Sequence, residues 1–317
     1  MAQNEIYDVI IVGGGPAGLT AGIYAKRAAM ETVLVEKGIP GGQVAVTPGV
    51  ENYPGFPEIG GFELSEKFSQ HAQSYGLEIR QTEAEKVVPG TDYHSVHLSD
   101  GGELKAHALI LGTGGSPRTL NIPGEQDNFG RGVSYCATCD GFFFRGKEVA
   151  VIGGGDTALE DALYLSKIAS KVYLIHRRDA FRASRILQDK VHADPNIQTV
   201  LNSVVDEVNS DASGVTGLSV RNTQTDELQQ LDCEGLFILV GFSPNKDLVP
   251  EGVEMSSTNS VITDEKCETA IPGIYAVGDL RHKYANQIVL AAADGCTAAL
   301  ASTHHVEAVK RKENVQA

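Results

Sequence analysis

Short apolar runs alternate along the chain with longer stretches in which small and apolar residues recur at helical spacing. The run at residues 9–12 is followed by three glycines, a helical stretch and a second apolar run at residues 33–35. Short apolar runs bounded by glycine are typical of buried parallel strands, which need a helical crossover between them. Residues 8–37 are therefore predicted to form a strand, a helix and a second strand.

The same pattern occurs a second time. Residues 148–177 align with residues 8–37 without a gap, at an offset of 140 (148 minus 8). The second copy has its apolar runs at residues 149–152 and 172–175. A repeated strand–helix–strand unit predicts an α/β fold with two Rossmann-like dinucleotide-binding domains, one for each copy.

Each copy has small residues at the three positions of a phosphate-binding turn. The first position allows a tight turn, the second lets the backbone approach a pyrophosphate at the helix N-terminus, and the third lets helix and strand pack closely. These positions are Gly13, Gly15 and Gly18 in the first copy, and Gly153, Gly155 and Ala158 in the second. Asp156 and Thr157 follow the second turn directly and are predicted to belong to its nucleotide site.

The residues that close each second strand indicate which nucleotide binds. Glu36 closes the first copy, and its carboxylate can accept hydrogen bonds from ribose hydroxyls but would repel a 2′-phosphate. The second copy has His176, Arg177 and Arg178, with Arg182 four residues further. Guanidinium groups bind a phosphate dianion through paired hydrogen bonds. The second copy therefore favours NADP(H), and a solvated basic turn is the alternative.

A third apolar strand is predicted near the C-terminus. Residues 274–277 end at Gly278 and Asp279, and a helix of small residues begins at about Gln287. A glycine–aspartate pair after a strand is equally compatible with a plain turn and with a binding site.

Composition limits the class of protein. The 317 residues allow two domains, and no apolar run approaches the roughly 20 residues of a membrane-spanning helix. The first residues lack the basic region of a secretion signal, and the net charge of −15 argues against a nucleic-acid surface. Cys233, Cys267 and Cys296 are scattered, unlike the cysteines of a disulfide-stapled secreted domain. A reducing, cytoplasmic location is therefore predicted.

Several stretches together resemble one family. The resemblance is carried by GGGPAGLTAGIYAKRA, GGQVAVTPGVENYPGFP, YCATCDGFFFRGKEVAVIGGGDTALEDA, HRRDAFRAS and GIYAVGD. These stretches are similar to those of the low-molecular-weight thioredoxin reductases, which are FAD-dependent pyridine-nucleotide disulfide oxidoreductases. The resemblance covers essentially the whole chain, and the CATCDG stretch between the two nucleotide units is its most specific part.

The resemblance implies that FAD binds the first unit together with the C-terminal segment. Asp279, with Gly278, is implied to contact the ribityl-phosphate part of the flavin. Further FAD contacts are implied for Gly42 and Gln43 in the stretch that begins at Glu36, and for Asn52, Gln287 and Ile288. The chain departs from the family at Asn286, where relatives often have arginine, and at Gly112, where they often have alanine. The first departure bears on the surroundings of the flavin or on subunit contacts.

The resemblance also implies how the domains are arranged. The second unit is inserted into the first, so that residues 1–115 and 248–317 form the FAD-binding domain. Residues 116–247 form the NADP(H)-binding domain with the redox cysteines. This domain is implied to rotate between half-reactions, and Gly114, Gly115 and Gly241 are suited to be its hinges. Relatives are homodimers, so a homodimer is expected.

Cys136 and Cys139 admit three interpretations. Zinc needs four ligands, and no second C-x-x-C or nearby Cys/His pair completes a site, so no metal is predicted. A structural disulfide is unusual in a cytoplasmic enzyme. A redox dithiol suits a chain with FAD and NADPH, because a hydride delivers two electrons and opening a disulfide consumes two.

The resemblance assigns a role to each thiol. Cys139 is implied to exchange electrons with the flavin, and Cys136 to attack the disulfide of a thioredoxin-like protein. The mixed disulfide is then resolved by Cys139. Asp140 follows directly and is predicted to carry the proton, with a helix cap as the alternative.

Three other functions compete with this interpretation. The flavoprotein partner of a peroxiredoxin usually has an additional N-terminal disulfide domain, whereas this chain starts at the FAD strand. A small-molecule dithiol oxidase would pass electrons to oxygen rather than to thioredoxin. A non-enzymatic redox sensor would bind the nucleotides without turnover.

Overall fold

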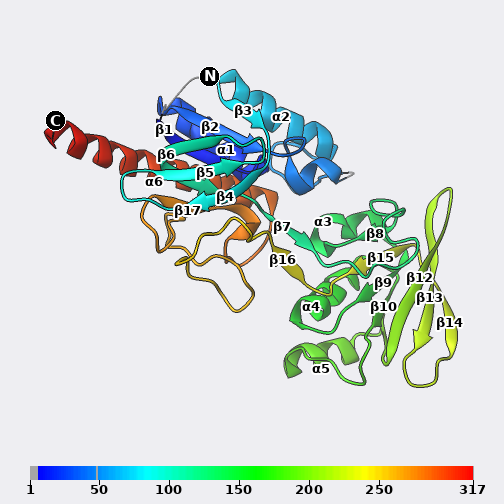
Figure 1. Ribbon diagram of the computed structural model, residues 1–317. Helices are drawn as coiled ribbons and strands as arrows, with labels where there is room; N and C mark the ends of the chain where they lie inside the picture. Colours follow the sequence, from blue (N-terminus) through cyan, green and yellow to red (C-terminus); the bar gives the residue numbers. More distant parts are fainter. Residues whose placement is uncertain (1–5, 48, 317) are drawn as a thin grey trace. The chain divides into compact units, whose positions relative to one another are not determined.

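The computed structural model describes residues 6–47 and 49–316. The chain divides into two compact units (Figure 1). The inserted unit is Pro117–Phe242, and the split unit is formed by the segments on either side of it. The N-terminal segment that was expected to lack a secretion signal begins in residues 1–5, which lie outside the described residues. No helix in the described part of the chain has the length and apolar character required to cross a membrane.

The split unit is built on a seven-stranded sheet with the order β3-β2-β1-β6-β5-β4, in which β17 also pairs with β6. Its strands are β1 (Ile6–Val12), β2 (Thr32–Glu36), β3 (Glu78–Gln81), β4 (Ala84–Val88), β5 (His94–Leu98), β6 (Glu103–Leu111) and β17 (Ile274–Ala276). Strand β1 pairs in parallel with one edge of β6, while β5 and β17 share its other edge. The C-terminal segment thus completes a sheet that the N-terminal segment begins.

Both faces of this sheet are covered, as the uninterrupted apolar runs predict for buried parallel strands. Val9 and Ile11 of β1 pack in one core with α1 and α6, whereas Ile10 and Val12 pack in a second core on the opposite face. The helices of this unit are α1 (Pro16–Arg27), α2 (Gly61–Ser74) and α6 (Ile288–Gln316), with the 3₁₀ turns η1 (Gly42–Val46) and η3 (Gly278–Leu280).

The inserted unit has a five-stranded parallel sheet with the order β11-β10-β9-β15-β8, and a three-stranded antiparallel sheet β12-β13-β14. The strands are β8 (Val133–Ser134), β9 (Glu148–Ile152), β10 (Lys171–Ile175), β11 (Ile197–Val200), β12 (Ser203–Asp211), β13 (Gly214–Asn222), β14 (Leu228–Asp232) and β15 (Gly235–Ile238). The helices are α3 (Ala137–Asp140), η2 (Gly141–Phe144), α4 (Asp156–Leu165) and α5 (Arg185–Ala193).

The two faces of the parallel sheet of the inserted unit have different covers (Figure 1). Val149 and Val151 of β9 pack with residues of α4 and α5, while Ala150 and Ile152 pack with residues of the antiparallel sheet. The prediction of an α/β fold with two Rossmann-like units is confirmed. The antiparallel sheet was not predicted.

The chain passes between the units only twice within its described part, at Ser116–Pro117 and at Phe242–Ser243. The two connections pair with each other as strands β7 (Gly115–Pro117) and β16 (Phe242–Pro244). Gly114 and Gly241 lie beside these connections, with φ angles of 68° and 131°. Glycine adopts such angles at little cost, whereas other residues are strained there.

Candidate active site and nucleotide-binding turns

Cys136 and Cys139 are joined by a disulfide bond, with their Cα atoms 5.3 Å apart. Cys136 is extended and immediately precedes α3, which begins at Ala137. Ala137 is buried in the core beside α4, so the short helix is fixed at its first residue. Both cysteines are half-buried, which leaves the disulfide partly accessible.

Asp140 lies at the end of α3 and is bound to Ser134, a residue that sequence reasoning did not single out. The Ser134 hydroxyl donates to Asp140 Oδ2 at 2.6 Å and accepts from the backbone N–H of Cys136 at 3.0 Å. Burial raises the pKa of Asp140 above its ordinary value, and the hydrogen bond from Ser134 opposes this increase. Asp140 is also the N-cap residue of η2, but its side chain makes no capping hydrogen bond in the described structure.

An aromatic surface follows the disulfide in η2. Phe142 and Phe143 are 50% and 40% exposed, whereas Phe144 is buried in the core. The Arg145 guanidinium lies over the Phe142 ring, 4.8 Å from its centroid. Adjacent exposed aromatic rings are uncommon on a surface without a binding role.

The second glycine turn lies at the N-terminus of α4. Gly155 is the N-cap, and a Cβ at this position would meet no atom within 4 Å, so a ligand can approach the backbone. Gly153 has no such room, because a Cβ there would overlap the Cβ of Ala158. The middle residue, Gly154, lies directly under the imidazole of His176. The turn is thus open on the helix side and closed toward the strand.

The basic segment after β10 is held against this turn. The backbone N–H groups of Arg182 and Ala183 both donate to the carbonyl of Gly154, at 2.7 and 3.2 Å. The carboxylate of Asp156 accepts from the backbone N–H of Ser184 at 2.7 Å. Asp156 therefore fixes this segment, and the neighbouring Thr157 is exposed.

Three arginine side chains in this segment are exposed: Arg177, Arg178 and Arg182. Among the described residues none of them has an ion-pair partner, whereas the nearby Arg185 pairs with Asp189 at 3.0 Å. Burial lowers the pKa of His176, and the arginines lower it further. The segment thus carries concentrated positive charge beside a turn with free N–H groups.

The first glycine turn lies at the N-terminus of α1. Gly13 has a φ of 105°, and a Cβ there would overlap the carbonyl oxygen of Gly112. A Cβ at Gly18 would overlap the carbonyl of Gly13, so both positions exclude larger residues. Gly15 is the N-cap of α1, and its Cβ position is open within 4 Å, as at Gly155.

Glu36 at the end of β2 is bound to this turn. Its carboxylate accepts from the backbone N–H of Gly14 at 2.6 Å and from that of Gly38 at 2.8 Å. Glu36 also lies against Gly14, as His176 lies against Gly154, because a Cβ at either glycine would meet that side chain. The middle glycine of each turn was visible in the repeat, but no role was assigned to it.

The remaining predicted FAD residues come together in the split unit. Gly42 lies against Gly15, because a Cβ on Gly42 would be 3.4 Å from the Gly15 Cα. Asn52 Nδ2 donates to Gln287 Oε1 at 3.2 Å, and Ile288 packs on the small core beneath η1. Residues 51–57 line an open hollow of about 570 Å³ beside this pair. Gln43 is exposed at the start of η1.

The Gly278–Asp279 turn lies against the first turn of α1. Gly278 has a φ of 66°, and a Cβ there would be 3.2 Å from the Cβ of Ala17. Burial raises the pKa of Asp279, and the ammonium group of Lys283 lowers it. The turn that ends β17 therefore adjoins the glycine turn that ends β1, although they are at opposite ends of the chain.

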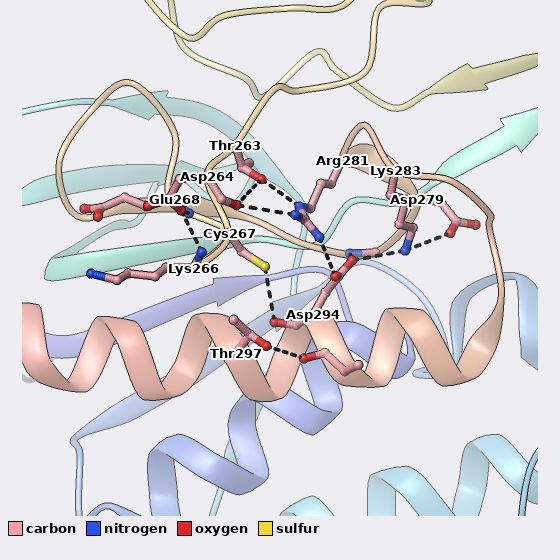
Figure 2. A network of polar contacts seen from close by, with 12 residues as sticks. Thr263, Asp264, Lys266, Cys267, Glu268, Asp279, Arg281, Lys283, Asp294 and Thr297 are labelled. Atoms are coloured by element: carbon pink, nitrogen blue, oxygen red, sulfur yellow. Dashed lines mark hydrogen bonds and ion pairs between the residues drawn. The ribbon is translucent and has the colours of Figure 1, made fainter.

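A network of ion pairs behind this turn was not anticipated (Figure 2). It consists of Arg281, Lys283 and Asp294, with Asp279 at its edge. No regular spacing marks these residues in the sequence. No group of three or more His, Cys, Asp or Glu side chains within residues 6–47 and 49–316 is arranged to hold a metal ion.

Two dinucleotide turns and a C-x-x-C disulfide in one chain define a class, the nucleotide-dependent disulfide oxidoreductases. Residues 7–295 match the family described as pyridine nucleotide-disulphide oxidoreductase. The chain is 42% identical over 308 residues to a thioredoxin reductase of Bacillus subtilis, which covers 97% of both proteins. It is 41% identical over 317 residues to a thioredoxin reductase of Listeria monocytogenes, covering 100% of this chain and 99% of the relative.

A comparison with a solved structure gives the same family. The crystal structure of thioredoxin reductase from Streptococcus pyogenes matches with a TM-score of 0.93 and 39% identity, covering 96% of this chain and 100% of the other. The chain therefore belongs to the pyridine nucleotide-disulphide oxidoreductases, and within them to the thioredoxin reductase group. It is an oxidoreductase enzyme.

Proposed function

We propose that this enzyme passes electrons from NADPH, through FAD held by the split unit, to the Cys136–Cys139 disulfide. The resulting dithiol then reduces the disulfide of a thioredoxin-like protein. The observation that carries the proposal is the disulfide itself, which is only half-buried and lies in a chain with two dinucleotide turns. The name thioredoxin reductase, borne by relatives that match nearly the whole chain, supports the choice of partner.

The proposed reaction takes two electrons and one proton from the hydride of NADPH, and a second proton from water. Opening the Cys136–Cys139 bond takes up the two electrons, and FAD, when bound, would supply the two-electron chemistry that links the hydride to the disulfide. The Cys136 thiolate attacks the partner's disulfide and releases one partner thiol. Cys139 then attacks the Cys136 sulfur, which restores the enzyme's disulfide and releases the second partner thiol.

Asp140 is proposed to exchange the proton that accompanies this chemistry. Its carboxylate is held by Ser134, and the same hydroxyl binds the backbone of Cys136. Because burial raises the pKa of Asp140, the carboxyl group stays closer to the range in which it can both donate and accept a proton.

The inserted unit is proposed to bind NADPH. Gly155 and Thr157 would face the phosphates at the N-terminus of α4, and Gly153 would form the tight turn behind them. Arg177, Arg178 and Arg182 would bind the 2′-phosphate. The fit is supported by His176, whose Nε2 is buried and has no partner among the described residues. Buried polar atoms rarely remain without a partner, so a ligand group is expected there.

The split unit is proposed to bind FAD. Gly15 offers an open approach to the N-terminus of α1, and Glu36 lies across the same turn. The hydrogen bond between Asn52 and Gln287 borders the open hollow of residues 51–57. Asp279 is proposed to contact the ribityl-phosphate part of the cofactor.

The exposed rings of Phe142 and Phe143 are proposed to contact the protein substrate. They follow Cys139 by three and four residues, so a protein whose disulfide reaches Cys136 would also cover them. Aromatic side chains are enriched where proteins bind one another. A small-molecule disulfide would not need this surface.

The inserted unit is proposed to rotate about the β7 and β16 connections during turnover. Two connections flanked by glycines of positive φ support such a motion. We also propose a homodimer, supported by the exposed apolar side chains Tyr24, Val289, Leu290 and Leu300 on α1 and α6. The free thiols of Cys233 and Cys267 support a reducing, cytoplasmic location.

Anaerobic titration of the purified protein with NADPH and with NADH, followed by oxidised thioredoxin, tests the proposal. NADPH should bleach the flavin absorption, and thioredoxin disulfide should restore it with release of two thiols. Bleaching by NADPH with no response to thioredoxin, but rapid recovery in oxygen, would favour a dithiol oxidase. Absence of bleaching would leave only nucleotide binding and would contradict the proposal.

A further inference from the structure

Asp294 joins three groups behind the Gly278–Asp279 turn (Figure 2). Its Oδ1 accepts from Arg281 Nη1 at 2.7 Å, and its Oδ2 accepts from Lys283 Nζ at 3.1 Å. The backbone N–H of Gly278 donates to the same Oδ2, also at 3.1 Å. One carboxylate of α6 therefore holds both the backbone of the turn and two cations that follow it.

Burial distinguishes these contacts from ordinary surface ion pairs. The side chains of Lys283 and Asp294 are 8% and 10% exposed, and that of Arg281 is 19% exposed. Exposed ion pairs contribute little to stability, whereas removing one partner of a buried pair leaves an uncompensated charge. Replacing a buried ion pair by apolar residues of similar volume is often neutral or stabilising. The stability of the fold alone therefore does not explain why charged residues occupy these positions.

The charge balance of the turn supplies that explanation. Lys283 Nζ also lies 3.8 Å from Asp279 Oδ1, so its ammonium group stands between two carboxylates. Asp279 and Asp294 carry two negative charges, which Lys283 and Arg281 offset. Without the cations, the turn would present net negative charge to an anionic pyrophosphate at the adjacent N-terminus of α1.

We propose that Lys283 and Asp294 are positioning residues for the FAD site. Asp294 fixes the backbone of Gly278, and Lys283 fixes the carboxylate of Asp279 and offsets its charge toward the phosphates. This inference rests on the proposed assignment of the split unit to FAD. It adds that the affinity for FAD depends on residues that do not themselves contact the cofactor.

The test is a titration of FAD into protein from which the flavin has been removed. Fluorescence monitors the binding and gives the affinity for FAD. Lys283→Met and Asp294→Asn should each weaken FAD binding by about tenfold or more, since a charge-assisted hydrogen bond contributes roughly 1.5–3 kcal/mol. Lys310→Met is the matched control. Lys310 of α6 also pairs with a buried aspartate, Asp8, but this pair lies at the end of β1 away from the glycine turn. Replacing Lys310 should therefore leave the FAD affinity within about twofold of its original value.

The pH dependence of FAD affinity separates positioning from a general loss of structure. Lys283 lowers the pKa of Asp279, so in Lys283→Met the change in FAD affinity that accompanies protonation of Asp279 should be centred at a higher pH than in the unaltered protein. Asp294 has the opposite effect on this pKa. Lys283→Arg keeps the charge and should restore most of the affinity.

Equal FAD affinity in the unaltered protein, Lys283→Met and Asp294→Asn would overturn the inference. A loss of the same factor at every pH that Lys283→Arg does not restore would also overturn it. Thermal unfolding checks that each variant is folded, and a variant that does not fold is replaced by Lys283→Gln or Asp294→Glu. If the unaltered protein binds no FAD, the proposed function fails rather than this inference.

Discussion

The side-chain amide of Asn52 donates to the side-chain carbonyl of Gln287 at 3.2 Å, across 235 residues of sequence. This bond joins the segment after η1 to the start of α6, and the whole inserted unit lies between them in the chain. The predicted FAD residues Asn52 and Gln287 therefore come together only when both segments of the split unit are in place.

The two thiols can be distinguished by trapping. In Cys139→Ser, Cys136 can still attack a thioredoxin disulfide, but no thiol resolves the product, so a covalent complex should accumulate. In Cys136→Ser the yield of this complex should be at least about tenfold lower, because we expect Cys139 not to reach a protein substrate. Non-reducing electrophoresis measures both yields. A higher yield in Cys136→Ser would reverse the assignment.

The arginine segment should discriminate between nucleotides. Replacing Arg177 and Arg178 together by alanine removes charge-assisted contacts of roughly 1.5–3 kcal/mol each, so NADPH binding should weaken by about 100-fold or more. NADH lacks the 2′-phosphate and should bind within about threefold of its original affinity. Arg185→Ala is the control, because Arg185 already pairs with Asp189. Parallel losses for NADPH and NADH would contradict the assignment.

Ser134→Ala should shift the pH profile of disulfide exchange. The hydroxyl lowers the pKa of Asp140 against the effect of burial, so its removal should raise that pKa and move the associated limb of the profile to higher pH. The rate of thiol release from a small aromatic disulfide by the reduced enzyme, measured from pH 5 to 9, reports this limb. Ser134→Thr keeps the hydroxyl and should restore the original profile.

Asp140→Asn removes the titrating group and should abolish that limb, while FAD binding stays unchanged. If the profile in Asp140→Asn retained the limb and its midpoint, the proton would be carried by another group. In that case Ser134 would be a structural partner of α3 only.

A histidine cluster should make the split unit sensitive to acid. His94 Nδ1 accepts a hydrogen bond from the backbone N–H of Gly90 at 3.3 Å. Because an accepting nitrogen carries no proton, this contact requires the neutral form of the imidazole. Burial first, and then His305 and His107, lower the pKa of His94. A lowered pKa in the folded state means that the stabilisation is present above the unfolded pKa of about 6.5 and is lost as pH falls below it.

The change to test is His94→Gln, which keeps a polar side chain but does not titrate. The fall in Tm between pH 7.5 and pH 5.5 should be smaller in this variant than in the unaltered protein. His304→Gln is the control, because His304 is exposed on the same helix as His305. A fall in Tm that is identical in all three proteins would show that the cluster does not sense pH.

The parts of this molecule that sequence reasoning predicted well are those fixed by local geometry. Gly13 and Gly18 leave no room for a Cβ, and Gly15 and Gly155 cap their helices, so the turns follow from a few adjacent residues. The strand ends follow similarly from apolar runs that stop at glycine. Such signals are complete within about 30 residues, and the repeat reinforced them.

The contacts that were missed depend on distant parts of the chain. Asp294 contacts Arg281 and Lys283 only because α6 lies behind the turn at the end of β17. No regular spacing in the sequence predicts these contacts. Ser134 has an ordinary position at the end of a two-residue strand, and its importance depends on the folding back of α3. The residues at Asn52 and Gln287 were named through family resemblance, since each alone is an unremarkable polar residue.

The division of the split unit into two segments also determines the order in which the two units can fold during translation. The inserted unit is a single stretch, so both of its sheets and both cysteines have been synthesised before the last 75 residues (317 minus 242) are made. The split unit cannot be complete at that stage, because residues 109–111 at one edge of β6 lack their partner strand β17, and the apolar face of α1 lacks its contacts with α6. The segment that carries Cys136 and Cys139 can therefore fold before the split unit is complete. Translation itself therefore separates the folding of the cysteine-bearing unit from the completion of the split unit.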